Sequence, residues 1–493
     1  MTLQDEKRDL LKKIGSGKMA TVAYDTAWVA RLNDFTPEIS DKSLGWLCEH
    51  QLSDGSWGAE TPYYYHDRVI STLAAMIALS QRGRRGSDMA QIRRGQEALR
   101  KIISGATHGL AADPNGATVG FEMIAPTLAK EAVELGLIDD QANHILGRMA
   151  GMREAKVEKL KGRITRSVTM AFSAEMAGRN LDMLDVEKLP EANGSIGFSP
   201  SATAYYALRV RPGDPNALAY LHEHACGESG GIPDVSPFDT FEVAWTLRNL
   251  HLTDPSIVND PGTLPHIEFL KQAWQKGQGR GVGFAADYSV KDSDDSGLTF
   301  EVLSKFGVQL DLSPILTYEN NSHFCCYDLE ADPSISAQVH VLGALRSADL
   351  PVNCAQSAKV ISYLQSMCQQ GRWIDKWHLS PYYPTAHAVI VCAGYAGDTA
   401  APAVDWILAT QSKDGSWGTY GPTAEETAYC VQALSAWNTS EPSKVDIIIA
   451  IKKGISWLLD HVDLPYPPLW IGKALYCPEY VVRSAVLSAL EAR

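Results

Sequence analysis

The run Asp292-Ser-Asp-Asp295 places three carboxyl groups within four positions. Crowded carboxylates cannot all ionise cheaply, so in a poorly solvated pocket one of them keeps its proton at neutral pH. A hydrogen bond from a neighbouring side chain then stabilises the anion that remains after the proton has left. An alkene is a very weak base and needs such a donor. This run therefore indicates an acid that could protonate a carbon–carbon double bond.

Two plainer interpretations of the same run stay open. An acidic run is most often a solvated loop or a helix start, where carboxylates cap free backbone N–H groups. Hard cations also favour carboxylates, which makes a metal site the other alternative. The pairs Asp139-Asp140 and Glu425-Glu426 lack the DDxxD spacing of a trinuclear magnesium cluster. Spacing alone gives no sign of the ionisation of an allylic diphosphate.

A carbocation formed by protonation would need an apolar cavity, whose aromatic faces stabilise positive charge without offering a nucleophile. Aromatic residues are frequent in the second half of the chain, and Trp377 and Tyr383 are candidates for the substrate-binding wall. Most of the other aromatic residues in this half are expected to lie in the core or at the surface.

Helices must position these groups, because helical periodicity dominates the chain. Ile70, Leu73 and Ile77 follow the spacing of one helix face, and alternating strand-like runs are almost absent. The segment Gln51-Leu-Ser-Asp-Gly-Ser-Trp-Gly58 recurs as Gln411-Ser-Lys-Asp-Gly-Ser-Trp-Gly418, each copy before an apolar helix. We expect an all-α fold of two related α/α domains. In each motif the Trp is expected to be a structural staple.

The composition excludes several partners and compartments. The chain has 493 residues and a net charge of −14, with Lys and Arg scattered, which argues against a nucleic-acid partner. Its nine Cys residues form no metal-binding or disulfide pattern. Without a signal core or a long apolar stretch, no transmembrane segment is expected, and we predict a soluble cytoplasmic protein.

Several segments together resemble the class II diterpene cyclases, in particular the small bacterial ones. They follow the family order over nearly the whole chain: Ala23-Tyr-Asp-Thr-Ala-Trp-Val-Ala30, Gln51 to Gly58, His66-Asp67-Arg68, Gly120-Phe121-Glu122 with Ala125-Pro126, Phe198-Ser-Pro-Ser-Ala-Thr-Ala-Tyr205, the DSDD run, Thr423-Ala-Glu-Glu-Thr-Ala-Tyr429 and the second QxxDGSWG. The resemblance implies two α/α-barrel domains, the βγ didomain, without a class I α domain. It places a split β domain with the acid at 1–45 and 240–493, and an inserted γ domain at 46–239.

The resemblance also implies the reaction. Such enzymes protonate the terminal alkene of geranylgeranyl diphosphate and cyclise it with the diphosphate retained. Asp294 matches the proton-donating position, and Asp292 and Asp295 match its supporting acids. His340 falls where the family places an Asn or His that hydrogen-bonds the donor. Read without the family, His340 is more simply a core histidine on a helix.

The diphosphate site is less clear from the family pattern. Plant members carry an acidic motif thought to hold Mg²⁺, and only Asp113 and Asn115 of Ala112-Asp-Pro-Asn-Gly116 remain here as candidate metal ligands. Lys156 matches a lysine that contacts the diphosphate in relatives, although a solvated helix lysine explains it nearly as well. Magnesium dependence is expected.

One departure from the family bears on the product. Where copalyl-type plant enzymes have a His/Asn pair that removes the last proton, this chain has Phe172 and Asp234. Without that base the first bicyclic cation should survive for hydride and methyl shifts, so we expect a rearranged kolavenyl (clerodienyl) or halimadienyl diphosphate. Tyr476 matches a family tyrosine near the cavity that shapes the pocket or assists the late deprotonation.

Several rivals stay open at this stage. The enzyme could accept farnesyl diphosphate and make drimenyl diphosphate, or it could be a copalyl diphosphate synthase. Squalene-type cyclases generally have more QxxDGxWG copies, and an α/α-toroid glycosidase would need two acids across a sugar cleft. A helical scaffold would leave the acidic run as surface decoration. A class I synthase or a phosphatase is expected to act downstream on the prenyl diphosphate product.

Overall fold

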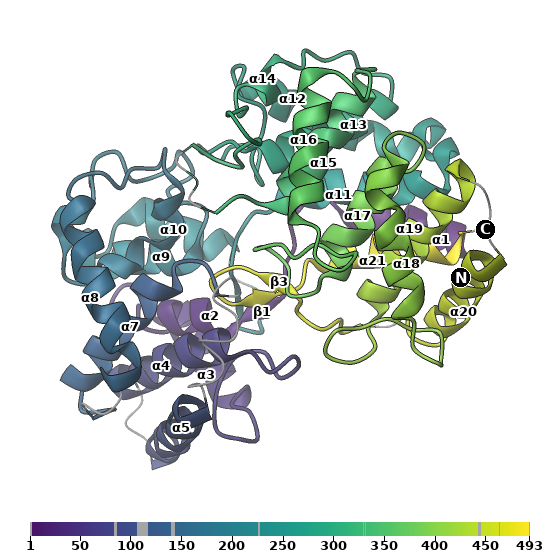
Figure 1. The fold of residues 1–493 in the computed structure, drawn as a ribbon. Helices are drawn as coiled ribbons and strands as arrows, with labels where there is room; N and C mark the ends of the chain where they lie inside the picture. The colour runs from purple at the N-terminus through teal and green to yellow at the C-terminus, as the bar shows by residue number, and fades with distance from the viewer. Residues whose placement is uncertain are drawn as a thin grey trace. The chain divides into compact units, whose positions relative to one another are not determined.

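Helices are the main elements of the chain, joined by loops and two short antiparallel strand pairs (Figure 1). The computed structural model describes residues 2–82, 86–105, 117–139, 143–224, 227–328, 330, 332–441, 445–462 and 464–492. The predicted all-α class is confirmed. Among the helices that lie within these ranges, none is both long enough and apolar enough to cross a membrane.

Contacts divide the chain into two compact units, and the first contains Met1–Lys18, Phe238–Pro467 and Cys477–Arg493. In its described part, six helices pack in sequence as a closed ring that returns from the last helix to the first. They are α11 (Asp239–Thr253), α13 (Ser293–Lys305), α15 (Ile335–Ser347), α17 (Tyr382–Cys392), α19 (Ala424–Ser440) and α21 (Glu479–Leu490). Residues on most sides of these helices are buried, as expected for the inner layer of an α/α barrel.

An outer layer of amphipathic helices covers this ring. In one of its helices Ile451 and Leu458 are buried while Lys452 and Lys453 are exposed, which is the pattern of a helix with one face on the core. The outer helices are α12 (Leu264–Lys276), α16 (Ala355–Met367), α18 (Gly397–Ala409) and α20 (Val445–Leu459). The unit also contains α1 (Leu3–Lys13), which packs on α21 (Figure 1), and the short elements α14 (Ser313–Leu316), η5 (Pro255–Asn259) and η6 (Pro261–Thr263).

The second unit, Met19–Pro237 with Pro468–Tyr476, repeats the ring on a smaller scale. Its buried inner elements, which pack in sequence and close on themselves, are α2 (Ala23–Val29), α4 (Tyr65–Arg82), α7 (Phe121–Glu134), the 3₁₀ segment η2 (Thr169–Ala177) and α9 (Pro200–Tyr205). Its other helical elements are α3 (Pro37–Glu49), α5 (Gly86–Gly105), α8 (Asn143–Lys159), η3 (Leu181–Met183), η4 (Tyr206–Val210) and α10 (Pro215–His224).

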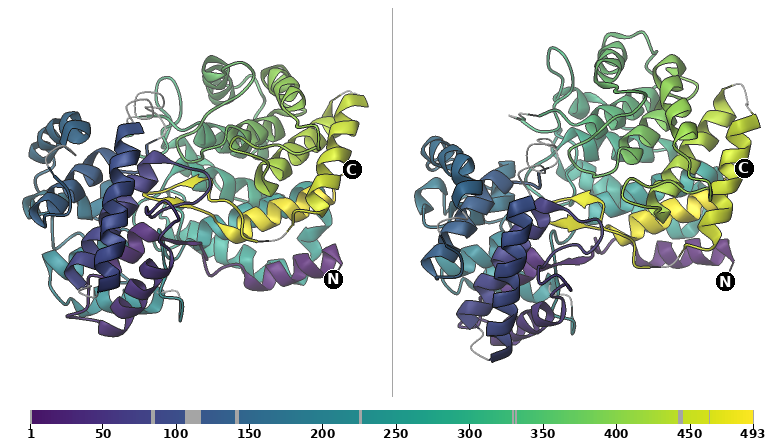
Figure 2. Two further views of the ribbon diagram at one scale, coloured as in Figure 1. Left: turned by 90° about the horizontal axis from the view of Figure 1, so that it is seen from below. Right: turned by 60° about the horizontal axis from the view of Figure 1, so that its bottom comes forward.

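A short hairpin close to the C-terminus belongs to this second unit. Strands β3 (Trp470–Ile471) and β4 (Leu475–Tyr476) pair with each other, and β1 (Thr21–Val22) pairs with β2 (Ile232–Pro233). The hairpin turn is tied into the unit, because the N–H of Val119 donates to the carbonyl of Gly472 at 2.8 Å. The two views in Figure 2 show this yellow hairpin beside the purple N-terminal part of the unit.

This division differs from the predicted domain boundaries at two places. Residues 19–45 group with the inserted unit and not with the split one, because α2 packs against α4 and α9. The hairpin within 468–476 also groups with the inserted unit. Residues 19–45 run directly into the inserted unit, whereas the hairpin returns to it from far along the chain, and motif order indicated neither assignment.

The two QxxDGSWG motifs are structural, as predicted. The indole N–H groups of Trp57 and Trp417 each donate at 2.8 Å to a carbonyl of the preceding helix, Leu47 and Ile407 respectively. Each also donates its backbone N–H to a threonine hydroxyl of the following helix at 3.0 Å. Trp373 makes the same two kinds of bond, so the segment before α17 is a further copy that its sequence conceals.

Candidate active site

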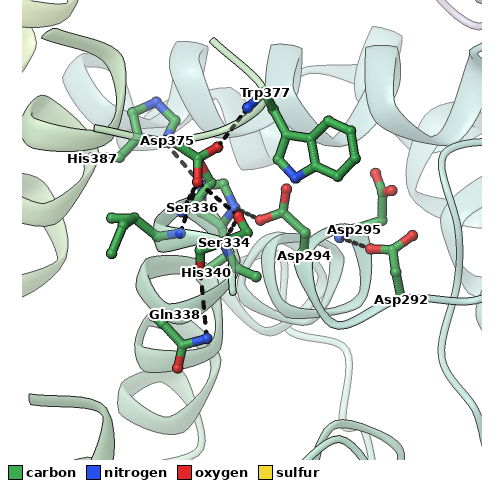
Figure 3. A network of polar contacts seen from close by, with 12 residues as sticks. Asp292, Asp294, Asp295, Ser334, Ser336, Gln338, His340, Asp375, Trp377 and His387 are labelled. Atoms are coloured by element: carbon green, nitrogen blue, oxygen red, sulfur yellow. Dashed lines mark hydrogen bonds and ion pairs between the residues drawn. The ribbon is translucent and has the colours of Figure 1, made fainter. Parts of the chain in front are cut away.

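The acidic run forms the start of α13, where its three carboxyl groups take different positions (Figure 3). Asp292 is the N-cap and accepts a hydrogen bond from the backbone N–H of Asp295 at 2.7 Å. Its own N–H donates to the carbonyl of Val282, and the N–H of Ser293 donates to the carbonyl of Cys326, both at 3.0 Å. The capping interpretation is therefore correct for Asp292. The other two carboxyl groups of the run have different surroundings.

Two of the three carboxyl groups, those of Asp292 and Asp295, are buried and interact with each other. Two buried, interacting carboxyl groups favour the protonated form of one of them. Burial, opposed by the bonds from Asp295 and reinforced by the charge of Asp294, raises the pKa of Asp292 to about 7. Burial and the nearby Asp292 carboxylate raise the pKa of Asp295 well above its usual value. The pair thus holds at least one proton near neutral pH.

Asp294 points away from this pair and reaches the next helix of the ring. Its side chain is 15% exposed, whereas Asp292 and Asp295 are 3% and 6% exposed. Its Oδ1 atom lies 2.6 Å from Nδ1 of the fully buried His340 on α15 (Figure 3). Asp294 is consequently the acid of the run with both a hydrogen-bond partner and an open side.

His340 belongs to α15, and the N-terminus of this helix is held by an aspartate that was not predicted from the sequence. Oδ1 of Asp375 accepts from the Ser334 hydroxyl at 2.9 Å and from the N–H groups of Ile335 and Ser336 at 2.7 and 3.2 Å. Its Oδ2 accepts from the N–H of Trp377 at 3.2 Å. Asp375 thereby ties two predicted site segments together. No spacing in the sequence distinguishes it from a surface acid.

Both predicted aromatic residues of the wall lie in this unit. Trp377 is half-buried, and its indole turns toward Asp294 in the view of Figure 3. Tyr383 is fully buried on α17, and its hydroxyl accepts the indole N–H of Trp245 at 2.9 Å. The Trp245 ring in turn meets the edge of His340 at 5.2 Å between centroids. Aromatic side chains therefore lie beside both His340 and Asp294.

A chain of nitrogen groups continues from His340 into the ring. Nε2 of His340 lies 2.9 Å from Nδ1 of His387 on α17, and Nη1 of Arg248 on α11 lies 3.4 Å from Nε2 of His387. All three side chains are buried. Burial, with the charges of Arg248, His340 and His378, holds the pKa of His387 well below its ordinary value. Of these three residues, only His340 was predicted from the sequence.

The other predicted site residues belong to the second unit, where a buried lysine joins two of them. Nζ of Lys473 donates to the backbone carbonyl of Phe172 at 2.9 Å and lies 4.5 Å from the centre of its ring. The backbone N–H of Lys473 donates to Oδ2 of Asp234 at 3.3 Å. Tyr476 is buried in the same hairpin. Lys473, which the sequence analysis missed, thus lies among the residues expected to decide the product.

Charge is balanced around this lysine by carboxyl groups. Nζ of Lys473 is 3.0 Å from Oε1 of Glu175, and the fully buried carboxyl groups of Asp25 and Asp234 interact with its charge. Burial raises the pKa of both aspartates. Burial alone would lower the pKa of Lys473, but Glu175, Asp25 and Asp234 raise it above its usual value. Lys473 is therefore a cation and cannot accept a proton.

The predicted diphosphate contacts are only partly described. Lys156 is exposed on α8 and is paired with Glu122 at 2.8 Å, as a solvated helix lysine would be. Asp113 and Asn115 lie outside the described residues. Within the described ranges, a group with metal-ligand spacing is His323, Cys325 and Glu330. Its nitrogen and sulfur atoms do not suit Mg²⁺, which prefers oxygen ligands.

Comparison with known proteins gives full-length matches. The chain is 45% identical over 495 residues to a Type B diterpene cyclase of Mycobacterium tuberculosis, with 98% of each chain covered. It is 28% identical to a labda-7,13-dienyl diphosphate synthase of Streptomyces clavuligerus, over 96% of this chain and 89% of the relative. No family model matches.

Among solved structures, the ent-copalyl diphosphate synthase from Streptomyces platensis superposes with a TM-score of 0.79 at 27% identity, covering 99% of both chains. The match extends over both units of the chain, so the two helical barrels share their fold with this structure.

Proposed function

Since the chain belongs to the class II diterpene cyclases, we propose that it cyclises geranylgeranyl diphosphate with Asp294 as the proton donor. The contact that carries this assignment is the 2.6 Å hydrogen bond between Asp294 and His340. The relative of 45% identity is named a diterpene cyclase, which supports a C20 substrate. A prenyl diphosphate is thus the partner of this site.

In the first step, the two oxygen atoms of the Asp294 carboxyl group have different roles. The O–H bond at Oδ2 breaks, and its proton forms a C–H bond with the electron pair of the terminal alkene. The tertiary cation left behind is attacked by the next double bonds, so two rings close while the diphosphate stays attached. His340 donates to Oδ1 and stabilises the new carboxylate, which lowers the barrier of this step.

Asp292 and Asp295 support the acid indirectly. Because the pair holds at least one proton, it places less negative charge beside Asp294 than two free carboxylates would. Trp377 and Tyr383 are the proposed aromatic wall, whose faces stabilise the cation. The main role proposed for Tyr476 is to shape the cavity. Its second proposed role is to assist the last deprotonation.

We propose a rearranged product, a kolavenyl or halimadienyl diphosphate. Phe172 has no basic atom, Asp234 is buried and accepts from the backbone N–H of Lys473, and the Lys473 ammonium ion lies over the Phe172 ring. This arrangement supports a long-lived bicyclic cation, because no neutral base stands where plant copalyl-type enzymes carry one. Accumulation of copalyl diphosphate from the wild-type enzyme would refute the rearrangement.

Mg²⁺ is proposed as the counterion of the diphosphate, with Asp113 and Asn115 as ligands and Lys156 as an additional charge. Their carboxylate, amide and ammonium groups are of the right type for a magnesium diphosphate. When bound, the ion would neutralise charge on the substrate. Loss of turnover after chelation, restored by Mg²⁺ and reduced in Asp113→Ala, is the expected result. Full activity without divalent ions would contradict it.

The deciding experiment compares wild type and Asp294→Asn with geranylgeranyl diphosphate. The amide keeps the shape but carries no acidic proton, so turnover should fall by about 10²–10⁴-fold through the loss of the general acid. Products are identified by mass spectrometry after phosphatase treatment. Unchanged turnover in Asp294→Asn would remove the donor role.

Incubation with farnesyl diphosphate tests the main rival. Faster turnover of farnesyl diphosphate to drimenyl diphosphate would favour that C15 reaction. Absence of turnover with both substrates would favour a non-catalytic scaffold.

A further inference from the structure

The hydrogen-bond partner of Asp294 is itself held by two buried groups. His340 uses Nδ1 for Asp294 at 2.6 Å and Nε2 for Nδ1 of His387 at 2.9 Å. Nη1 of Arg248 then lies 3.4 Å from Nε2 of His387 and 3.5 Å from Nδ1. Since Nδ1 of His387 already faces His340, Nε2 is the nitrogen left for Arg248. The four groups form a single line through α11, α17, α15 and α13.

One arrangement of protons satisfies this line with neutral imidazoles when Arg248 donates to Nε2 of His387. A neutral imidazole has one N–H donor and one acceptor nitrogen, whereas a guanidinium group can only donate. With Arg248 as the donor to Nε2, the proton of His387 lies on Nδ1. That proton is donated to Nε2 of His340. The proton of His340 must then lie on Nδ1, where it points to Asp294.

Arg248, the first group of this line, is a buried cation held by an ion pair. Arg248 is 1% exposed, and its Nε atom is 3.5 Å from Oε2 of Glu301 on α13. Glu301 is also paired with Lys305. Although burial alone would raise it, the charges of Lys305 and Arg248 lower the pKa of Glu301, which keeps this counterion ionised. The guanidinium group is thus fixed beside His387 by a carboxylate of the helix that carries Asp294.

We propose that Arg248 and His387 are positioning residues that lock His340 in the tautomer whose Nδ1–H donates to Asp294. This inference rests on the proposed function for its effect on turnover, although the tautomer itself does not depend on it. In the opposite tautomer a lone pair of Nδ1 would face Asp294. The carboxylate formed on proton transfer would then lose its donor, and His340 would compete with the alkene for the proton.

The tautomer is measured directly on the full-length wild-type enzyme, with ¹⁵N-labelled histidine and NMR correlation of ring nitrogens with ring protons. The signals of His340 are assigned by their loss in His340→Asn. Protonation of His340 on Nδ1 alone is expected. Protonation on Nε2, or an equal mixture, would overturn the proposal without any measurement of activity.

Two substitutions at His387 separate positioning from packing. Gln can donate to His340 and accept from Arg248, so His387→Gln should keep the Nδ1–H tautomer. Leu can do neither, so in His387→Leu the Nε2–H form of His340 should become populated. An unchanged tautomer in a folded His387→Leu enzyme, verified by circular dichroism, would contradict the inference.

Kinetics with geranylgeranyl diphosphate supply the second readout. His387→Leu should lower kcat by about 10²-fold with little change in KM, because a donor to the developing anion is lost. His387→Gln should recover most of this loss. Equal kcat in the two variants, or a change confined to KM, would overturn the kinetic role. If the wild type does not turn over the substrate, the proposed function fails while the tautomer measurement still stands.

Discussion

Gly297 of α13 lies so close to His340 of α15 that a Cβ atom at position 297 would be 2.8 Å from both the carbonyl carbon and the carbonyl oxygen of His340. The two inner helices can therefore approach only because residue 297 has no side chain. This approach lets Asp294, on one helix, reach Nδ1 of His340, on the other, at 2.6 Å.

Gly297→Ala is expected to separate the two helices and weaken the Asp294–His340 hydrogen bond. We expect a loss of about 1–3 kcal/mol in the free energy of unfolding. The fall in kcat should approach about 10²-fold, because a displacement of about 1 Å is enough for that. Gly45→Ala is the matched control, since no atom lies within 4 Å of a Cβ atom there. It should leave kcat unchanged, and equal kinetics of the two variants would contradict the contact's role.

The proton held by the Asp292–Asp295 pair predicts a pH-dependent stability. The pKa of Asp292 is raised from 3.8 to about 7 in the folded state. Its contribution is complete below 3.8 and is lost as the pH rises through about 7. Asp292→Asn keeps the cap but carries no titratable proton. The free energy of unfolding of the variant, relative to that of wild type, should therefore be larger at pH 8 than at pH 5, by about 1–3 kcal/mol.

Urea denaturation at the two pH values measures this difference. Asp414→Asn provides the control, because bonds from Ser416 lower the pKa of the exposed Asp414, which stays ionised from pH 5 to pH 8. Its effect should be the same at both values. An Asp292→Asn effect that does not change with pH would argue against a proton held by the pair.

Asp375→Ala tests whether the N-terminus of α15 positions His340. The substitution leaves the buried N–H groups of Ile335 and Ser336 without their acceptor, which costs about 1–3 kcal/mol per unsatisfied group. Both stability and kcat should fall. Asp311→Ala is a matched control, because exposed Asp311 lies just before α14 and accepts a hydrogen bond from the N–H of Ser313 at 3.0 Å. It should leave kcat intact; a similar kcat loss in both variants would point to a general effect of stability.

Local rules predicted a large part of the molecule. Helical periodicity located α4, and the repeated motif predicted the structural role of Trp57 and Trp417. Within the acidic run, Asp292 caps α13 while Asp294 reaches His340. A helix start is what separates the two carboxyl groups, since successive helical residues point in different directions.

The remaining contacts depend on closure of the helix rings, which no local sequence pattern indicates. Arg248 and His387 are 139 positions apart and meet only because α11 and α17 belong to one ring. Lys473 and Phe172 are 301 positions apart, and the hairpin that joins them interrupts the other unit in sequence. Each of these side chains resembles an ordinary core or surface residue until the fold brings it to its partner.

Phe172→His returns a base to the position where copalyl-type plant enzymes have one. The Lys473 ammonium ion lies 4.5 Å from the centre of the Phe172 ring, so a new imidazole should be held neutral by the adjacent cation. A neutral imidazole can remove a proton from the first bicyclic cation before any shift occurs. The product should therefore change from the proposed rearranged diphosphate toward copalyl diphosphate, detected by mass spectrometry after phosphatase treatment. Phe172→Leu, which removes the ring without adding a base, should give no copalyl product; if it gives as much as Phe172→His, cavity shape and not a base controls the outcome.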